Sequence, residues 1–308
     1  MDWWLVLIII FCSTVFLFLM GFPVAFSLLL IDIIGFVVYG GIEAGPHIFI
    51  LSLYASVTKF SMLPLPLFIL MGEVMFQSGI ARHMMDTLDK WLGRVPGRLS
   101  LLAVGGGGLF ATLTGSSMAS SALLGSILVP EMMKRGYKKE MSIGPILGSG
   151  GLAIMIPPSV LGVILAASGQ FSVGDFLIAF IIPGLLIALT YTVYIVLRCR
   201  VQPHLAPSYD LTSHASLSEK ISLTLRYVLP LGSIIFLVIG LIFLGVATPT
   251  ESAALGAAGC FILAFFYKGL SWKVVKVSIE HTIKITVMML MIFAGSTAFS
   301  QILAYTGA

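Results

Sequence analysis

Long apolar runs, separated by short polar stretches, dominate this 308-residue chain. A helix needs roughly 20 apolar residues to cross a bilayer, and the strands of a membrane barrel are much shorter than these runs. The runs fall at Trp3–Met20, Val24–Tyr39, Ser61–Gln77, Met141–Ala167, Phe176–Leu197, Tyr227–Val246, Glu251–Tyr267 and Ile285–Ala304. The pattern therefore predicts an all-α polytopic membrane protein in contact with the lipid bilayer.

Composition supports this fold class. Hydrophobic residues make up 58% of the chain and charged residues 10%, with a mean hydropathy of +1.08, whereas soluble domains carry about 25% charged residues. The net charge of +4 comes from Lys and Arg in short loops, where such residues set the orientation of a protein in the membrane. The charge is therefore no sign of a nucleic-acid partner, and none is expected. The three cysteines and five histidines show no metal-ligand spacing, so no cofactor is expected.

Two shorter apolar stretches, Leu99–Thr114 and Ser117–Pro130, differ from the other runs. Neither quite spans a hydrocarbon core of about 30 Å at a rise of about 1.5 Å per residue. Basic residues flank the pair on both sides, which places both flanks in the cytoplasm by the positive-inside rule. The segment 99–130 is therefore predicted to be a re-entrant hairpin that enters and leaves the membrane by one face. Its tip is Thr114, Gly115, Ser116 and Ser117.

The run after the hairpin is predicted to break inside the membrane. Glycines at 148, 150 and 151 precede Ile156, Pro157, Pro158 and Ser159. Each proline removes a backbone donor, and Pro158 disfavours the helical conformation for the residue before it. The break in 141–168 would expose carbonyl oxygens suited to Na⁺ and a positive half-helix end suited to a carboxylate. A simple proline kink padded by glycines is the other interpretation.

The chain repeats itself weakly at an offset of roughly 225 residues. Gly21–Ala25 and Gly245–Thr250 each open an apolar helix, and Lys59–Gly79 resembles Lys284–Gly307. Counting crossings from the basic loops makes the members of each pair run in opposite directions. This pattern indicates an inverted-repeat, ion-transporter-type fold. The offset puts a second hairpin at about position 325, beyond Ala308, so we expect the second repeat to be incomplete and the chain to be truncated at its C-terminus.

These features predict four segments. Residues 1–60 form N-terminal scaffold helices, and residues 61–200 form a first-repeat transport region with the hairpin and the broken helix. Residues 201–222 form a cytoplasmic linker, whose end at Leu217–Leu229 has the pattern of an amphipathic helix. Residues 223–308 begin the second inverted repeat.

Several motifs together resemble a known family. They are Leu67–Met75, Leu113–Ala119, Ile127–Met132, Lys134–Tyr137 and Ile156–Ser159, followed in the same order by Pro183-Gly184 and Thr248–Glu251. In combination they resemble the large permease subunit (DctM) of tripartite ATP-independent periplasmic (TRAP) transporters, over essentially the whole chain. Many members have Asp after the Ala of the tip motif, whereas this chain has Ser120.

The resemblance implies Na⁺-coupled uptake of a carboxylate by an elevator mechanism, across the inner membrane of a bacterium. It implies two partners, a small membrane subunit and a periplasmic solute-binding protein that largely selects the organic acid. The residues that match the family's ion and substrate site are Thr114, Gly115, Ser116, Ser117, Gly150, Gly151, Ile156, Pro157, Pro158 and Ser159. Na⁺ would be the coupling ion and the only metal.

Two acids lie inside apolar runs, Asp32 in the second and Glu73 in the third. A charged group at membrane depth is costly and is a candidate functional residue. Glu73 is either a sodium ligand or a structural partner. Asp32 either pairs with a basic residue or contacts the small subunit.

Three other functions were weighed. A stand-alone sodium–anion symporter of related fold would work without a binding protein, and a passive channel would conduct without substrate coupling. An intramembrane enzyme would need a buried nucleophile and a base, but the chain has no Gly-x-Ser-x-Gly or His-Glu-x-x-His motif. We therefore expect no enzymatic activity.

Overall fold

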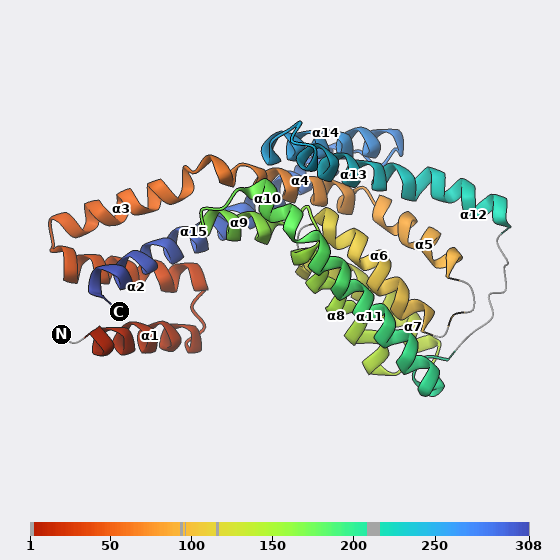
Figure 1. Cartoon of the computed structure of the whole chain (residues 1–308), viewed down its shortest axis with the longest axis horizontal. Helices are drawn as coiled ribbons and strands as arrows, with labels where there is room; N and C mark the ends of the chain where they lie inside the picture. Colours follow the sequence, from red (N-terminus) through yellow and green to blue (C-terminus); the bar gives the residue numbers. More distant parts are fainter. Residues whose placement is uncertain (1–2, 93–94, 96, 115–116, 208–215, 308) are drawn as a thin grey trace. The chain divides into compact units, whose positions relative to one another are not determined.

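The computed structural model describes residues 3–92, 95, 97–114, 117–207 and 216–307. These residues are helical throughout, with short turns and no strand, which confirms the predicted all-α class (Figure 1). They divide into two compact units. Unit 1 comprises residues 1–63 and 283–308, and unit 2 comprises residues 64–282.

Unit 1 packs three N-terminal helices with the end of the last helix. These are α1 (Trp3–Leu19), α2 (Val24–Gly40), α3 (Ala44–Val57) and the part of α15 (Trp272–Thr306) from residue 283 onward. A 3₁₀ turn (Phe60–Met62) follows α3. The unit buries an apolar core that includes Val6, Ile31, Phe49 and Ile302. Small residues allow its helices to approach one another: a Cβ added at Gly45 would lie 2.2 Å from the Phe36 carbonyl oxygen.

Unit 2 begins with the two arms of the hairpin and the helices around them. These are α4 (Pro64–Gln77), α5 (Ile80–Trp91), α6 (Arg98–Thr114), α7 (Ser117–Lys134) and α8 (Lys139–Met155). The hairpin arms α6 and α7 pack against each other and both pack against α8. Their facing side chains are buried, including Ala103, Phe110, Leu124 and Met132.

Six further α-helices and a π-helical turn precede α15 in the described part of unit 2. They are α9 (Val160–Ser168), α10 (Val173–Ala179), α11 (Ile181–Val201), α12 (Leu217–Leu223), a π-helical turn (Thr224–Val228), α13 (Leu229–Phe243) and α14 (Pro249–Phe266). A capping box starts α14: the Glu251 amide donates to Thr248 Oγ1 and the Thr248 amide donates to the Glu251 carboxylate. This explains locally why Thr and Glu flank Pro249. A second 3₁₀ turn, Pro203–Leu205, follows α11.

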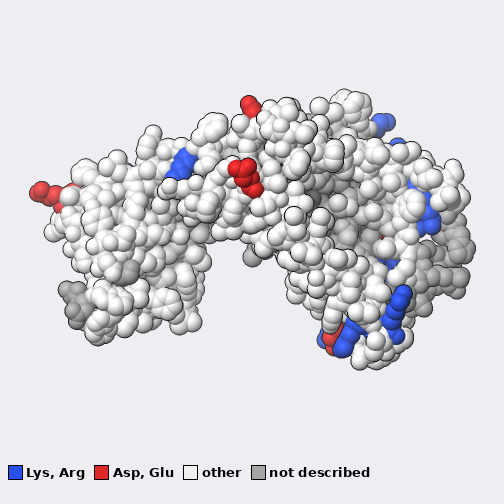
Figure 2. All heavy atoms as spheres, in the orientation of Figure 1, with Lys and Arg blue, Asp and Glu red and all other residues white. Residues whose placement is uncertain are grey.

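Five helical segments in the described part of the chain are long and apolar enough to cross a membrane, and the bent pair α8–α9 would make a sixth. Their outer faces carry exposed Leu, Ile, Phe and Val side chains. Figure 2 shows that Lys, Arg, Asp and Glu occupy only scattered positions on the visible face. An apolar outer surface over buried, packed helices is what a lipid-embedded protein requires.

Several elements differ from the expected runs. The helices α3 and α5 were not predicted, because α3 is short and α5 is amphipathic with charged residues on one face. The run Phe176–Leu197 is divided at Phe180 into α10 and α11, and α15 begins 13 residues before the predicted Ile285. The polar Lys273, Lys276 and Glu280 interrupt the apolar run there without interrupting the helix. The inverted repeat and the membrane orientation stay predictions.

A partly buried ion pair between Arg98 and Asp89 holds the start of the hairpin. Arg98 is 2% exposed, and its Nε donates to Asp89 Oδ1 at 2.8 Å while an Nη lies 2.7 Å from Oδ2. The same guanidinium also donates to the Asp89 carbonyl oxygen. The pair thus connects the end of α5 to the first residue of α6.

We predict that Arg98→Met lowers the free energy of unfolding by about 3–5 kcal/mol, because it leaves Asp89 without its bidentate partner. The exposed pair Lys90–Glu219, with an Nζ–Oε1 distance of 2.7 Å, is the control. Lys90→Met should cost less than about 1 kcal/mol. Chemical unfolding of both variants in detergent measures the difference, and equal losses would contradict the anchoring role of Arg98.

Candidate functional site

The candidate site lies in unit 2, where the first turn of α7 meets the middle of α8. Gly150 of α8 is buried, and a Cβ added to it would lie 3.0 Å from the carbonyl oxygen of Ser117. Two of the predicted site residues, one from each segment, are therefore in contact. The tip residues Gly115 and Ser116, and the side chain of Thr114, lie outside the described residues.

Ser121 belongs to this contact, although the sequence analysis did not single it out. Its Oγ would lie 2.3 Å from a Cβ at Gly150, so the hydroxyl occupies the space that the glycine leaves open. Ser117 and Ser121 are four residues apart, which puts them on one face of α7. This helical spacing was the available signal for Ser121.

Ser120 lies in the same turn of α7, between Ser117 and Ser121. Its side chain is fully buried, and its Oγ has no hydrogen-bond partner among the described residues. Buried hydroxyls are nearly always paired, so the oxygen of Ser120 is available to a further ligand. Ser120 precedes the buried Leu124 by four residues, which puts both on one face of the helix. The first turn of α7 therefore carries a buried hydroxyl without a partner, one residue before Ser121.

The predicted break in the following helix is present. Helix α8 ends at Met155, α9 begins at Val160, and the two helices are bent by 46° relative to each other. The peptide bond between Pro157 and Pro158 is cis. The two prolines cannot supply the amide donors that a continuous helix would need at this point.

Ser159 bridges the break. Its hydroxyl donates to the carbonyl oxygen of Ile154 in α8 at 2.7 Å and accepts from the amide of Gly162 in α9 at 3.0 Å. It thereby caps α9 and satisfies a carbonyl near the end of α8. Helix α11 also approaches the break closely. A Cβ added at Gly184 of α11 would lie 2.7 Å from the Met155 carbonyl oxygen, so only glycine allows α11 to lie this near the end of α8.

The remaining predicted residues lie around the break rather than at the Gly150 contact. Pro157 and Pro158 are buried and share a small apolar hollow with Leu177, Ile178 and Val238. Ile156 is half-buried. Gly151 is exposed, with no atom within 4 Å of an added Cβ.

The two acids of the apolar runs have different surroundings. Glu73 of α4 is 9% exposed, and its Oε2 lies 3.3 Å from Gln77 Nε2 and 3.4 Å from His281 Nδ1. It therefore has protein partners. Asp32 is fully buried in unit 1.

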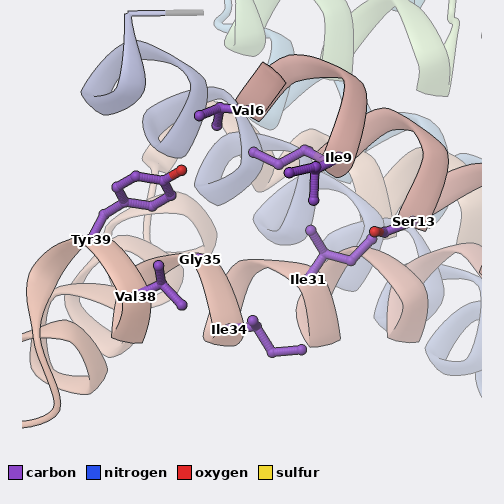
Figure 3. A pocket seen from close by; sticks show the side chains of 9 residues that line it. Val6, Ile9, Ser13, Ile31, Ile34, Gly35, Val38 and Tyr39 are labelled. Atoms are coloured by element: carbon purple, nitrogen blue, oxygen red, sulfur yellow. The ribbon is translucent and has the colours of Figure 1, made fainter. Parts of the chain in front are cut away.

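Two larger hollows lack the chemistry of an ion site. One of about 420 Å³ lies between α8 and α11, with Glu140 as its acidic residue. The other, of about 240 Å³, lies between α1 and α2 in unit 1, where Ser13 and Tyr39 supply the polar side chains (Figure 3). No group of three or more His, Cys, Asp or Glu side chains that could hold a metal occurs among the described residues.

Comparison with known proteins adds independent information. A family model described as "Tripartite ATP-independent periplasmic transporter, DctM component" matches residues 11–308. The C4-dicarboxylate TRAP transporter large permease protein DctM of Pseudomonas aeruginosa is 32% identical over 256 residues, which are 82% of this chain and 58% of the relative. The ectoine TRAP transporter large permease protein TeaC of Halomonas elongata is 29% identical over 94% of this chain and 66% of its own length.

A third relative is the isethionate TRAP transporter permease protein DctMQ of Oleidesulfovibrio alaskensis. It is 29% identical over 81% of this chain, and the match covers 39% of that protein. The chain thus spans about three-fifths of the length of the Pseudomonas relative and a smaller share of the DctMQ protein.

The contact at Gly150 yields a prediction. Gly150→Ala places a methyl group against Ser121 Oγ and the Ser117 carbonyl oxygen, so it should destabilise the protein by about 1–3 kcal/mol through overpacking. Ser121→Ala in the same chain should recover part of this loss, because it removes the nearer clashing atom. Unfolding measurements on the two single variants and the double variant give the interaction free energy between positions 150 and 121.

Gly151→Ala is the matched control, since its added methyl meets open space. It should change the unfolding free energy by less than about 0.5 kcal/mol, or raise it slightly, because alanine favours the helix. If both glycine variants behaved alike, the close approach of α7 to α8 at Gly150 would be refuted.

Proposed function

The chain belongs to the DctM component family of tripartite ATP-independent periplasmic transporters, and on this premise we propose that it serves as the large membrane subunit of a sodium-driven uptake system for organic acids. The family is one of transporter permeases rather than enzymes. In this proposal the subunit lies in the inner membrane of a bacterium. Unit 2 carries the site and moves across the membrane by an elevator mechanism.

The observation that carries the proposal is the contact between Ser117, Ser121 and Gly150, together with the unpaired Ser120 hydroxyl in the same turn of α7. Na⁺ is a hard cation that prefers oxygen ligands, and hydroxyl and carbonyl oxygens supply them without the cost of burying a charge. Secondary transporters place such oxygens where helices are broken near the middle of the membrane. The 46° bend between α8 and α9 lies next to this contact in the chain and provides such a break.

The relatives and the break support a proposal for the substrate class. The relatives' names specify C4-dicarboxylates, ectoine and isethionate, all small organic acids or zwitterions. We propose a carboxylate for this chain, held near the N-terminus of α9, where the helix dipole favours an anion. We also propose that a periplasmic binding protein delivers it.

The second proposed partner is a small membrane subunit. The DctMQ relative is much longer than the aligned segment, so it has room for further membrane helices. Exposed apolar side chains on α1 and α2, such as Phe11, Phe16 and Phe26, offer a surface for lipid or for such a subunit.

Sodium binding has a specific signature at Ser120. Removing a buried hydroxyl that has no protein partner should leave the sodium-free protein as stable as before, or slightly more stable. If the hydroxyl binds Na⁺, Ser120→Ala should weaken the sodium-dependent rise in melting temperature, with about a tenfold loss of apparent affinity. Melting of the purified chain in Na⁺ and in K⁺ measures both effects.

Ser278→Ala is the control, because Ser278 of α15 is also fully buried and its hydroxyl has no partner in the described chain. It should leave the sodium response unchanged. A wild-type protein with no sodium response would refute the proposed function. A sodium response that survives in Ser120→Ala would refute only the assignment of this residue.

Uptake tests the rest of the proposal. The gene is expressed together with its small subunit and binding protein in cells that lack other carboxylate uptake. These cells should accumulate a labelled dicarboxylate, and the accumulation should require a sodium gradient. Uptake that does not need the binding protein would instead indicate a stand-alone symporter.

A further inference from the structure

Asp32 is the buried acid that the proposed site does not use. It lies in the middle of α2, its side chain is 0% exposed, and neither Oδ1 nor Oδ2 has a hydrogen-bond partner among the described residues. Glu73, by contrast, lies within reach of Gln77 and His281. Two unpaired oxygens on one fully buried carboxyl require an explanation.

The carboxyl lies where α2 meets α15 within unit 1. A Cβ added to Gly295 of α15 would lie 3.0 Å from Leu28 Cβ and 3.8 Å from Asp32 Oδ2. Seven residues further along both helices, about two turns, a Cβ at Gly35 would lie 2.8 Å from Ile302 Cδ1. The contact is therefore close on both sides of Asp32, and the apolar core that contains Ile31 and Ile302 surrounds it.

A carboxylate in such a place must be neutralised, because the free-energy cost of desolvating an isolated charge is far larger than the stabilisation from the contacts around it. A cationic side chain is the first means. The charged or titratable groups on the elements packed against α2 in unit 1 are Cys12, Glu43, His47, Tyr54, Lys59, Lys284 and Tyr305. None of them pairs with Asp32, and the Lys59 ammonium lies over the Phe293 ring, 5.6 Å from its centre.

A metal ion is the second means. It would need several oxygen or nitrogen ligands around the carboxyl. The described residues contain no cluster of three acids, histidines or cysteines, and none of their polar groups hydrogen-bonds to the Asp32 carboxyl. The third means of neutralising the Asp32 carboxylate is a bound proton, which needs no further ligand.

We propose that Asp32 is a proton-binding site, occupied at neutral pH as long as α2 and α15 are in contact. The bound proton removes the charge and allows the carboxylic acid to lie against the Gly295 backbone. Water that reaches Asp32 after the helices separate would allow the acid to ionise. Opening of the α2–α15 contact is therefore coupled to release of one proton.

This site lies in unit 1, whereas the candidate sodium site lies in unit 2. It does not depend on the proposed transport function. The test can therefore fail or succeed independently of sodium binding.

Stability as a function of pH tests the proposal. A proton bound by the folded chain but not by the unfolded chain makes the unfolding equilibrium constant rise about tenfold per pH unit above the carboxyl's unfolded value near 4. From pH 5 to pH 7, wild type should lose about a hundredfold in folding equilibrium relative to Asp32→Asn, which is neutral at every pH. Asp86→Asn, at an exposed carboxylate of α5, should parallel wild type.

Parallel curves for wild type and Asp32→Asn would overturn the proposal. So would a sodium-dependent stabilisation that only Asp32→Asn loses, because the ligand would then be a metal cation. If Asp32→Asn does not fold, the infrared spectrum of wild type at pH 7 decides. A protonated carboxyl band should be present and should survive in Glu73→Gln, and its absence in wild type would refute the proposal.

Discussion

A helix that stops inside an apolar environment must satisfy its terminal backbone groups within the protein, and this constraint shapes unit 2. The two prolines that end α8 remove donors, and Ser159 compensates by bonding to Ile154 on one side and Gly162 on the other. Gly184 lets α11 approach the Met155 carbonyl more closely than any residue with a side chain would allow. The bent pair α8–α9 therefore stays ordered without a continuous hydrogen-bond ladder.

Glycines and small hydroxyl side chains also form the contact between the hairpin and the broken helix. Gly107 and Gly150 remove the side chains that would separate α6, α7 and α8, and the hydroxyls of Ser149 and Ser121 occupy the resulting space. The site is thus built from neutral oxygens at a close helix contact. Such a site can accept a small cation without holding a buried acid in its absence.

The sequence predicted the membrane class, the hairpin arms and the proline break, because long apolar runs and paired prolines have few structural outcomes. It did not predict α3, α5 or the early start of α15, where polar residues interrupt the apolar pattern but not the helix. Gly150 and Ser117 were predicted from motifs, whereas Ser121 became visible only through its contact. The surroundings of Asp32 depend on α15, more than 250 residues away in the chain, so no local pattern could indicate them.

The central claim is that the α7–α8 contact is where sodium binds. Hydrogen–deuterium exchange of the purified chain in Na⁺ and in K⁺ tests it most directly. The account predicts slower exchange in Na⁺ for amides at 117–124 and 148–162, and no change in α13 or in unit 1. Equal exchange in both salts at these segments, with protection elsewhere, would contradict it.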